Sequence, residues 1–229
     1  MYIISELVER PRFNLTRRAN CPPLFLRGAS NELLKHLCGQ QVQSLNDKIQ
    51  SLGFNNDFVI HTAPLIRREE IFANESPNKR RSLFISLFFF VLKSPISYKT
   101  FVFEKRQGET TLALEGRMAR EMSLFIRHNL QFFQNFEDVV LYYDNGQHEL
   151  NRILNYILST ELSTYSLRKV LPKDYKLFQA ADLICTLELL AKKYEYGELS
   201  KSEQILFHNK RELRKTFLHP IQKKRFMSS

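Results

Sequence analysis

Asp144 is the residue whose position most clearly suggests chemistry. It follows the apolar run VVLYY, residues 139–143, and precedes Asn145 and Gly146. The apolar run predicts a buried strand, so Asp144 would present a carboxylate at the end of that strand. Asp-Asn-Gly also suits a tight turn, because all three residues tolerate turn geometry and Asp can bond its own backbone. Both interpretations are compatible with this stretch.

A second carboxylate, that of Asp182, lies inside a strongly apolar helical pattern. Phe178, Asp182, Cys185 and Leu189 share one stripe by their spacing of three and four residues. The stripe predicts that Asp182 faces the protein body rather than water. A buried carboxylate must be protonated, hydrogen-bonded, paired with a cation or bound to a metal, and the structural alternatives stay open here.

Helical and strand patterns alternate along the chain and must position these two acids. Apolar residues recur with helical spacing in residues 31–54, from Leu83 to Pro95, from about Leu112 to Phe133, and in residues 148–158 and 176–195. Strands are expected in residues 58–66, 97–105, 139–143 and 165–171, whereas residues 10–28 give almost no signal. This alternation predicts an α/β domain with a largely parallel or mixed sheet. Ligands bind beyond the carboxyl ends of strands in such sheets, which is where Asp144 falls.

Length and composition predict one soluble domain with a C-terminal extension. The chain has 229 residues, of which 43% are hydrophobic and 25% charged. We expect a divergent segment at residues 1–44, the α/β domain at 45–200 and a basic extension at 201–229. The longest apolar run, Leu83 to Leu92, is far shorter than the roughly 20 residues of a membrane span, so no membrane partner is expected.

The cysteines and the first residues predict a cytoplasmic protein. Cys21, Cys38 and Cys185 are widely spaced and form no zinc-site pattern, so reduced thiols are expected. The opening MYIISELVER lacks the basic start and the apolar core of a signal peptide.

The charge distribution predicts an anionic partner. The formal net charge is +10, and residues 201–229 carry eight basic residues against two acidic ones. A basic surface of this kind binds phosphates through a strongly salt-dependent interaction, although a merely solvated basic end is also compatible. Removing residues 223–229 is expected to weaken that salt dependence. The expected nucleic-acid-binding residues are Lys210, Arg211, Arg214, Lys215, Lys223, Lys224 and Arg225.

Five segments together resemble an uncharacterised bacterial family catalogued as domain of unknown function 3800. They are HTAPLIRREE, YKTFVFEK, LYYDNGQHELNRIL, KVLPKDYKLFQAADLICTLELL and KKRF, in that order, between about Leu45 and Phe226. The resemblance implies a ribonuclease H-like mixed sheet flanked by helices. It also implies a Mg²⁺- or Mn²⁺-dependent acid cluster that acts on phosphodiester bonds of nucleic acid.

The resemblance assigns roles to individual residues. It makes Asp144 the metal ligand at a strand end and Asp182 the ligand on a helix. His61 matches a histidine that contacts a phosphate or water, and a structural histidine is equally compatible. Glu104 is a candidate for an additional carboxylate, against the alternative of a solvated strand end.

The most important part of the family pattern is missing. The family opens with an apolar strand that ends in Asp-Glu-Ser-Gly, whose aspartate is the central metal ligand. This chain has Ser5 where that aspartate would fall, Glu6 beside it and no aspartate before Asp47. A frameshifted or truncated start and a true variant that uses Glu6 are both compatible with the sequence.

Three functions therefore stay open. The first is a metal-dependent nuclease, and the second is a ribonuclease H-like protein that only binds nucleic acid or a protein. The third is a structural domain whose two aspartates bond backbone groups. Because the bridging ligand is absent, we expect feeble or no cleavage with Mg²⁺.

Overall fold

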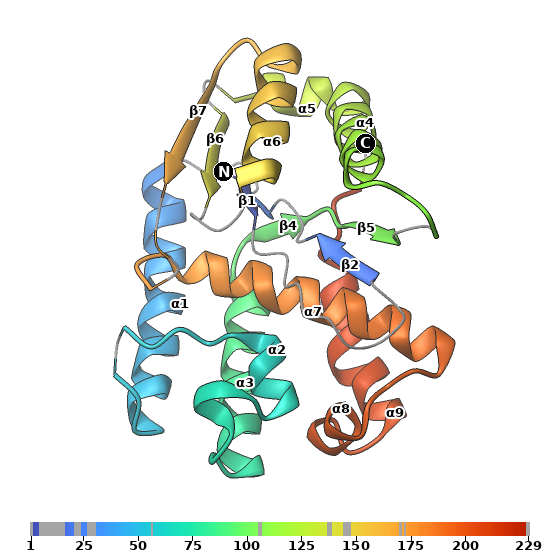
Figure 1. Ribbon diagram of the computed structural model, residues 1–229. Helices are drawn as coiled ribbons and strands as arrows, with labels where there is room; N and C mark the ends of the chain where they lie inside the picture. Colours follow the sequence, from blue (N-terminus) through green and yellow to red (C-terminus); the bar gives the residue numbers. More distant parts are fainter. Residues whose placement is uncertain are drawn as a thin grey trace.

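The computed structural model is a mixed α/β protein in which helices flank a small set of strands (Figure 1). This confirms the α/β class expected from the sequence. The structure describes the backbone of residues 2–4, 17–20, 24–26, 31–55, 57–104, 107–136, 139–143, 148–169, 171 and 173–227. It describes the side chains of residues 39–55, 57–103, 107–136, 139–142, 152–169, 171 and 173–227.

The strands form one parallel sheet and two antiparallel pairs. The parallel sheet has the order β1 (Tyr2–Ile4), β6 (Val139–Tyr143) and β7 (Tyr165–Lys169). The antiparallel pairs join β2 (Arg17–Asn20) to β5 (Phe101–Glu104) and β3 (Leu24–Leu26) to β4 (Ile96–Tyr98). β3 lies beside β1, but no strand pairing joins the parallel sheet to either antiparallel pair among the described residues.

Long helices surround these strands, and several ends follow ordinary capping rules. Ser76 caps one helix by accepting the Lys79 backbone N–H, with Pro77 in the first helical position. Gly197 ends the longest apolar helix in the left-handed region, with φ of 72°. The helices are α1 (Asn31–Ser51), α2 (Thr62–Arg67), α3 (Pro77–Lys93), α4 (Thr111–His128), α5 (Leu130–Gln134), α6 (His148–Glu161), α7 (Lys176–Tyr196) and α8 (Lys201–Leu206). The C-terminal helix consists of α9 (Lys210–Glu212), a π-helical stretch (Leu213–Leu218) and α10 (His219–Gln222), and a short 3₁₀ helix spans Glu70–Phe72.

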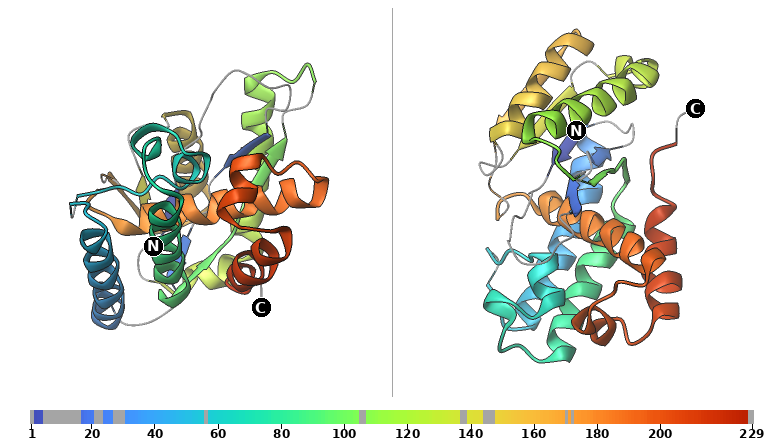
Figure 2. Two further views of the ribbon diagram at one scale, coloured as in Figure 1. Left: turned by 90° about the horizontal axis from the view of Figure 1, so that it is seen from below. Right: turned by 45° about the vertical axis from the view of Figure 1, so that its right-hand side comes forward.

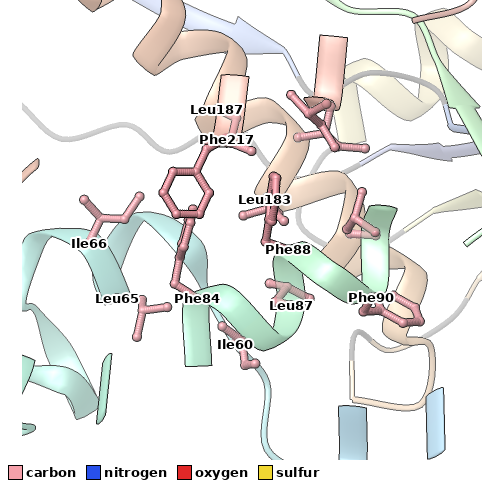
Figure 3. Close-up of a cluster of buried hydrophobic side chains, with 14 of the residues drawn as sticks. Ile60, Leu65, Ile66, Phe84, Leu87, Phe88, Phe90, Leu183, Leu187 and Phe217 are labelled. Carbon is pink, nitrogen blue, oxygen red and sulfur yellow. The ribbon is translucent and has the colours of Figure 1, made fainter. Parts of the chain in front are cut away.

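Two hydrophobic cores lie on opposite sides of the strands. The smaller core joins β5 and β6 to α4 and α6, and the larger one joins α1, α3, α7 and the C-terminal helix. Figures 1 and 2 show α4 and α6 on one side and α1, α2 and α3 on the other, with α7 beneath the strands. Figure 3 shows how Leu183 and Leu187 of α7 meet the side chains of α3 in the larger core.

The apolar run from Leu83 to Leu92 lies in α3, as its length predicts. Most of its side chains are buried, and Phe89 is an exception with half of its surface exposed. None of the helices in the described part of the chain is long and apolar enough to cross a membrane.

Four stretches differ from the sequence-based expectation. The strand expected in residues 97–105 consists of two short strands, β4 and β5, which pair with different partners. Residues 58–66 contain no strand, and their second half is the helix α2, which tolerates Pro64 in its first turn. The expected helix from Leu112 to Phe133 divides at Asn129, whose side-chain amide donates to the Phe125 carbonyl at 2.7 Å. The strands β2 and β3 lie within residues 10–28, where the pattern gave almost no signal.

The C-terminal segment is a part of the larger core. Phe207, Phe217 and Ile221 are each almost completely buried there, together with residues of α3 and α7. The basic residues of this segment therefore lie on a helix whose other face is firmly packed.

Cys185 corrects the expectation of reduced thiols. It is disulfide-bonded and buried in α7. Cys21 and Cys38 are the other cysteines of the chain, and their side chains lie outside the described residues.

Candidate functional site

Three polar side chains of α7 hold the extended segment that leads into α2. Lys176 donates to the Phe58 carbonyl at 3.0 Å, and Gln179 accepts the Ile60 backbone N–H at 3.1 Å. Asp182 accepts the Thr62 backbone N–H at 2.6 Å. The three side chains are spaced three residues apart, and they bond every second residue of the segment. They supply the hydrogen bonds that a neighbouring strand would otherwise provide.

Asp182 therefore has a structural hydrogen-bond partner and an environment that shifts its pKa. Thr62 is the first residue of α2, so Asp182 caps that helix from another part of the fold. Desolvation raises the pKa of Asp182, while the Thr62 N–H and the nearby His61 act in the opposite direction. The Thr62 side chain is also buried and interacts with the Asp182 carboxylate. The structure thus brings together His61, Thr62 and Asp182 at the start of α2.

The other acidic candidates are placed less completely. Asp144 follows β6 directly in the sequence, but Asp144 and Glu6 lie outside the described residues. Glu104 ends β5 opposite Arg17, in a pair separate from the parallel sheet that contains β6, and its side chain also lies outside the described part. The expected convergence of Asp144 and Asp182 stays a prediction.

The implied metal can be compared with the ligands that the structure describes. Mg²⁺ binds about six oxygen ligands in nearly octahedral geometry. The described side chains include no group of three His, Cys, Asp or Glu that could hold a metal, and Asp182 already accepts the Thr62 backbone N–H. The described residues alone therefore do not fit a Mg²⁺ or Mn²⁺ centre, which would need Asp144 or Glu6 to complete it.

Five of the seven basic candidates form an exposed surface on the C-terminal helix. Lys210, Arg211, Arg214, Lys215 and Lys223 are all exposed, and within the described residues none has an ion-pair partner. We call these five residues the C-terminal basic row. Lys210 and Arg211 lie in α9, Arg214 and Lys215 lie in the π-helical stretch, and Lys223 directly follows α10. The π-helical stretch ends shortly before Pro220, which lacks the backbone N–H that a regular helix requires.

The acidic residues of the same segment do not neutralise this row. Glu212 pairs with Arg81 of α3 at 2.5 Å, and Glu203 pairs with Lys193 of α7 at 2.6 Å. Both carboxylates thus interact with cations from outside the segment. The five cations of the C-terminal basic row are therefore not paired with these two carboxylates.

The other two basic candidates have internal roles. Lys224 donates to the Ser94 carbonyl at 2.7 Å, and desolvation lowers the pKa of Lys224. Arg225 forms two hydrogen bonds to the buried carboxylate of Glu188, at 3.1 and 2.5 Å. Removing residues 223–229 would therefore remove structural contacts as well as charge.

Glu188 also accepts a hydrogen bond from the buried Tyr98 hydroxyl at 2.5 Å. Desolvation, followed by the effect of Glu188, raises the pKa of Tyr98, so that Tyr98 stays neutral. Glu188, Tyr98, Lys176 and Gln179 were missed as site residues. The available signal was the presence of Lys176, Gln179 and Glu188 in a helix that is otherwise apolar on most sides.

Asp182 caps α2 and also carries a titratable charge, and two variants separate these effects on stability. Asp182→Ala leaves the Thr62 N–H without an acceptor, so we expect the free energy of unfolding to fall by about 1–3 kcal/mol. Asp182→Asn keeps an acceptor without the charge. Because the folded-state pKa of Asp182 is raised, its favourable contribution is complete below the unfolded pKa and is lost as pH rises through the folded pKa. Asp182→Asn should therefore become progressively more stable than the unaltered protein as pH rises.

Urea unfolding at several pH values between about 4 and 8 measures this difference. Equal stability changes for Asp182→Asn at every pH would contradict the raised pKa. An Asp182→Ala variant as stable as the unaltered protein would contradict the capping role.

No family model matches the chain, and neither a curated protein nor a solved structure gives a significant match.

Proposed function

We propose that this protein is a ribonuclease H-like domain that binds nucleic acid and has little or no Mg²⁺-dependent cleavage activity. The C-terminal basic row is the observation that carries the nucleic-acid part. It offers five exposed cations along one helix, while the acids of the same segment are paired elsewhere. Phosphates are the natural partners of such a surface, because contacts to Lys and Arg release condensed counterions.

The strand arrangement supports the ribonuclease H-like part. β1, β6 and β7 are parallel and adjacent in that order, and α7 contacts β1. Asp144 is the residue after β6, and Asp182 lies in α7. The resemblance places the residues of its acid cluster on a first strand, at a later strand end and on a late helix.

Neutralising three residues of the row tests nucleic-acid binding. The variant Arg211→Gln/Lys215→Gln/Lys223→Gln removes three exposed cations that have no ion-pair partner within the described residues. For a single-stranded probe, the log–log slope of affinity against salt should fall in magnitude by about 2, and affinity at about 0.1 M salt should fall about 100-fold. Fluorescence anisotropy with a labelled single-stranded DNA of about 30 nucleotides measures both quantities.

A matched control removes the same charge elsewhere. Lys48→Gln/Arg67→Gln/Lys93→Gln changes exposed residues of α1, α2 and α3 that have no ion-pair partner in the described part of the chain. This variant should keep a salt slope close to that of the unaltered protein. Equal effects of the two triple variants would show a response to net charge alone, and no binding by the unaltered protein would reject the proposal.

Metal-dependent cleavage is the second candidate function, favoured by the half-buried Asp182 beside His61. We expect no more than weak cleavage of DNA or RNA with Mg²⁺, and at most slightly more with Mn²⁺, because the central aspartate is absent. Cleavage assays on the unaltered protein and on Asp144→Asn measure this. Rapid Mg²⁺-dependent turnover that Asp144→Asn abolishes would show that the acid cluster is complete, whereas turnover indifferent to Asp144→Asn would remove Asp144 from the chemistry.

A further inference from the structure

A second set of cations lies at the carboxyl ends of β6 and β7. Arg168 and Lys169 are the last two residues of β7, and Lys173 lies in the connection to α7. All three are exposed, and none has an ion-pair partner among the residues that the structure describes. Asp174 is the one acidic residue within the described part of residues 165–175. Within the described part of residues 165–175, three cations therefore stand against one carboxylate.

The guanidinium of Arg168 lies over one aromatic ring, which stacks on a second ring. Tyr142 stands opposite Arg168 in the parallel pairing of β6 and β7, and its ring centre lies 5.9 Å from the Arg168 Cζ. The Tyr142 ring stacks in turn on Tyr175, with centres 4.8 Å apart and planes 17° apart. An Arg that interacts with a ring through its face keeps its N–H groups available at the edge, where they can bind two phosphate oxygens.

These cations are far from the C-terminal basic row. Figure 1 shows β7 at the upper left and α9 at the lower right, and both views in Figure 2 keep the two elements apart. In sheets of this class, ligands bind beyond the carboxyl ends of the strands. Arg168 and Lys169 lie at that end of β7, next to the end of β6 that Asp144 follows in the sequence.

We infer that Arg168, Lys169 and Lys173 form a second phosphate-contact surface, which holds a nucleic-acid backbone across the carboxyl ends of β6 and β7. This inference rests on the proposed nucleic-acid binding and adds the place where the backbone meets the sheet. Arg168 supplies the planar donor, and Lys169 and Lys173 supply flanking positive charge. Tyr142 is a positioning residue, because it acts on the ligand only through Arg168.

Single substitutions at these positions separate charge from orientation. Arg168→Gln should lower the affinity for a single-stranded DNA of about 30 nucleotides about fivefold at 0.1 M salt and reduce the salt slope by about 0.7. Arg168→Lys should keep the slope. Tyr142→Leu should also keep the slope, because it removes no charge, but lower affinity about two- to fivefold by freeing the guanidinium. Arg67→Gln is the matched control, an exposed charge on α2 that should change neither quantity.

The outcomes distinguish this surface from the C-terminal basic row. Unchanged affinity and slope in Arg168→Gln, together with loss of binding in the triple variant of the row, would overturn this inference and leave the proposed function intact. No binding of DNA by the unaltered protein would overturn both. A thermal melt of each variant, with an unchanged midpoint, ensures that altered binding does not reflect unfolding.

Discussion

A Phe217→Ala variant should lose about 3–5 kcal/mol of unfolding free energy, the range for truncating a buried phenylalanine. Phe217 is 2% exposed, and its ring meets those of Phe84, Phe88 and Phe207 edge-on, with centres 5.0–5.4 Å apart. Each such pair adds about 0.5–1.5 kcal/mol beyond area burial. Figure 3 shows Phe217 against Phe84 and Phe88, so the substitution empties a space between α3 and the C-terminal helix.

Urea unfolding followed by circular dichroism measures the loss, with Thr216→Ala as the control. Thr216 is the exposed neighbour of Phe217, and its truncation should change stability by less than about 0.5 kcal/mol. A loss below about 1 kcal/mol for Phe217→Ala would mean that the C-terminal helix contributes little to the core.

The composition of the C-terminal segment does not reveal its structural role. Residues 201–229 predict a basic extension because charge counts depend on residue type alone. The partners of each charge depend on the fold. Lys224 donates to the Ser94 carbonyl just before β4, and Arg225 donates to Glu188 of α7. Lys210 and Lys215, in contrast, remain exposed. Neighbouring Lys and Arg residues can therefore differ completely in role.

Elements with a strong local period could be predicted well. The helical repeats around α1, α3, α6 and α7 and the apolar run of β6 all correspond to observed elements. Their patterns are strong because each element has a face that packs into one of the two cores. The stripe that directed Asp182 toward the protein body belongs to this class.

Elements whose hydrogen bonds come from distant residues could not be predicted. β2 and β3 are only four and three residues long and depend on pairing with β5 and β4. Residues 58–62 have the composition of a strand, but their backbone bonds side chains of α7 almost 120 residues away. Local propensity contains no information about such partners.

The same limit applies to the candidate site. The position of Asp182 on an inward helical face could be derived from spacing, but its bond to the Thr62 N–H could not. His61 lies at the start of α2 beside that bond, and the phosphate or water contact that the resemblance gives it stays a prediction. A tertiary cap of this kind joins two elements that sequence periodicity treats separately.

Arg225→Ala should destabilise the protein by about 2–4 kcal/mol. The Glu188 carboxylate is 7% exposed and receives two hydrogen bonds from Arg225, so the substitution leaves a buried negative charge with only the Tyr98 hydroxyl. We place the effect somewhat below the range of about 3–5 kcal/mol for a broken buried ion pair, because Arg225 itself is 48% exposed. The backbone bonds between Tyr98 and the C-terminal segment remain, so the fold should persist.

Two comparisons isolate the effect of the unpaired charge. Lys223→Ala removes an exposed cation two residues away and should change stability by less than about 0.5 kcal/mol in the same urea titration. Adding Glu188→Gln to Arg225→Ala removes the buried charge, so the double variant should regain part of the lost stability. A double variant that is less stable than Arg225→Ala would show that the Arg225 side chain contributes mainly through packing. A loss no larger than that of Lys223→Ala would mean that Glu188 obtains enough water and enough hydrogen bonding from Tyr98 to remain charged without Arg225.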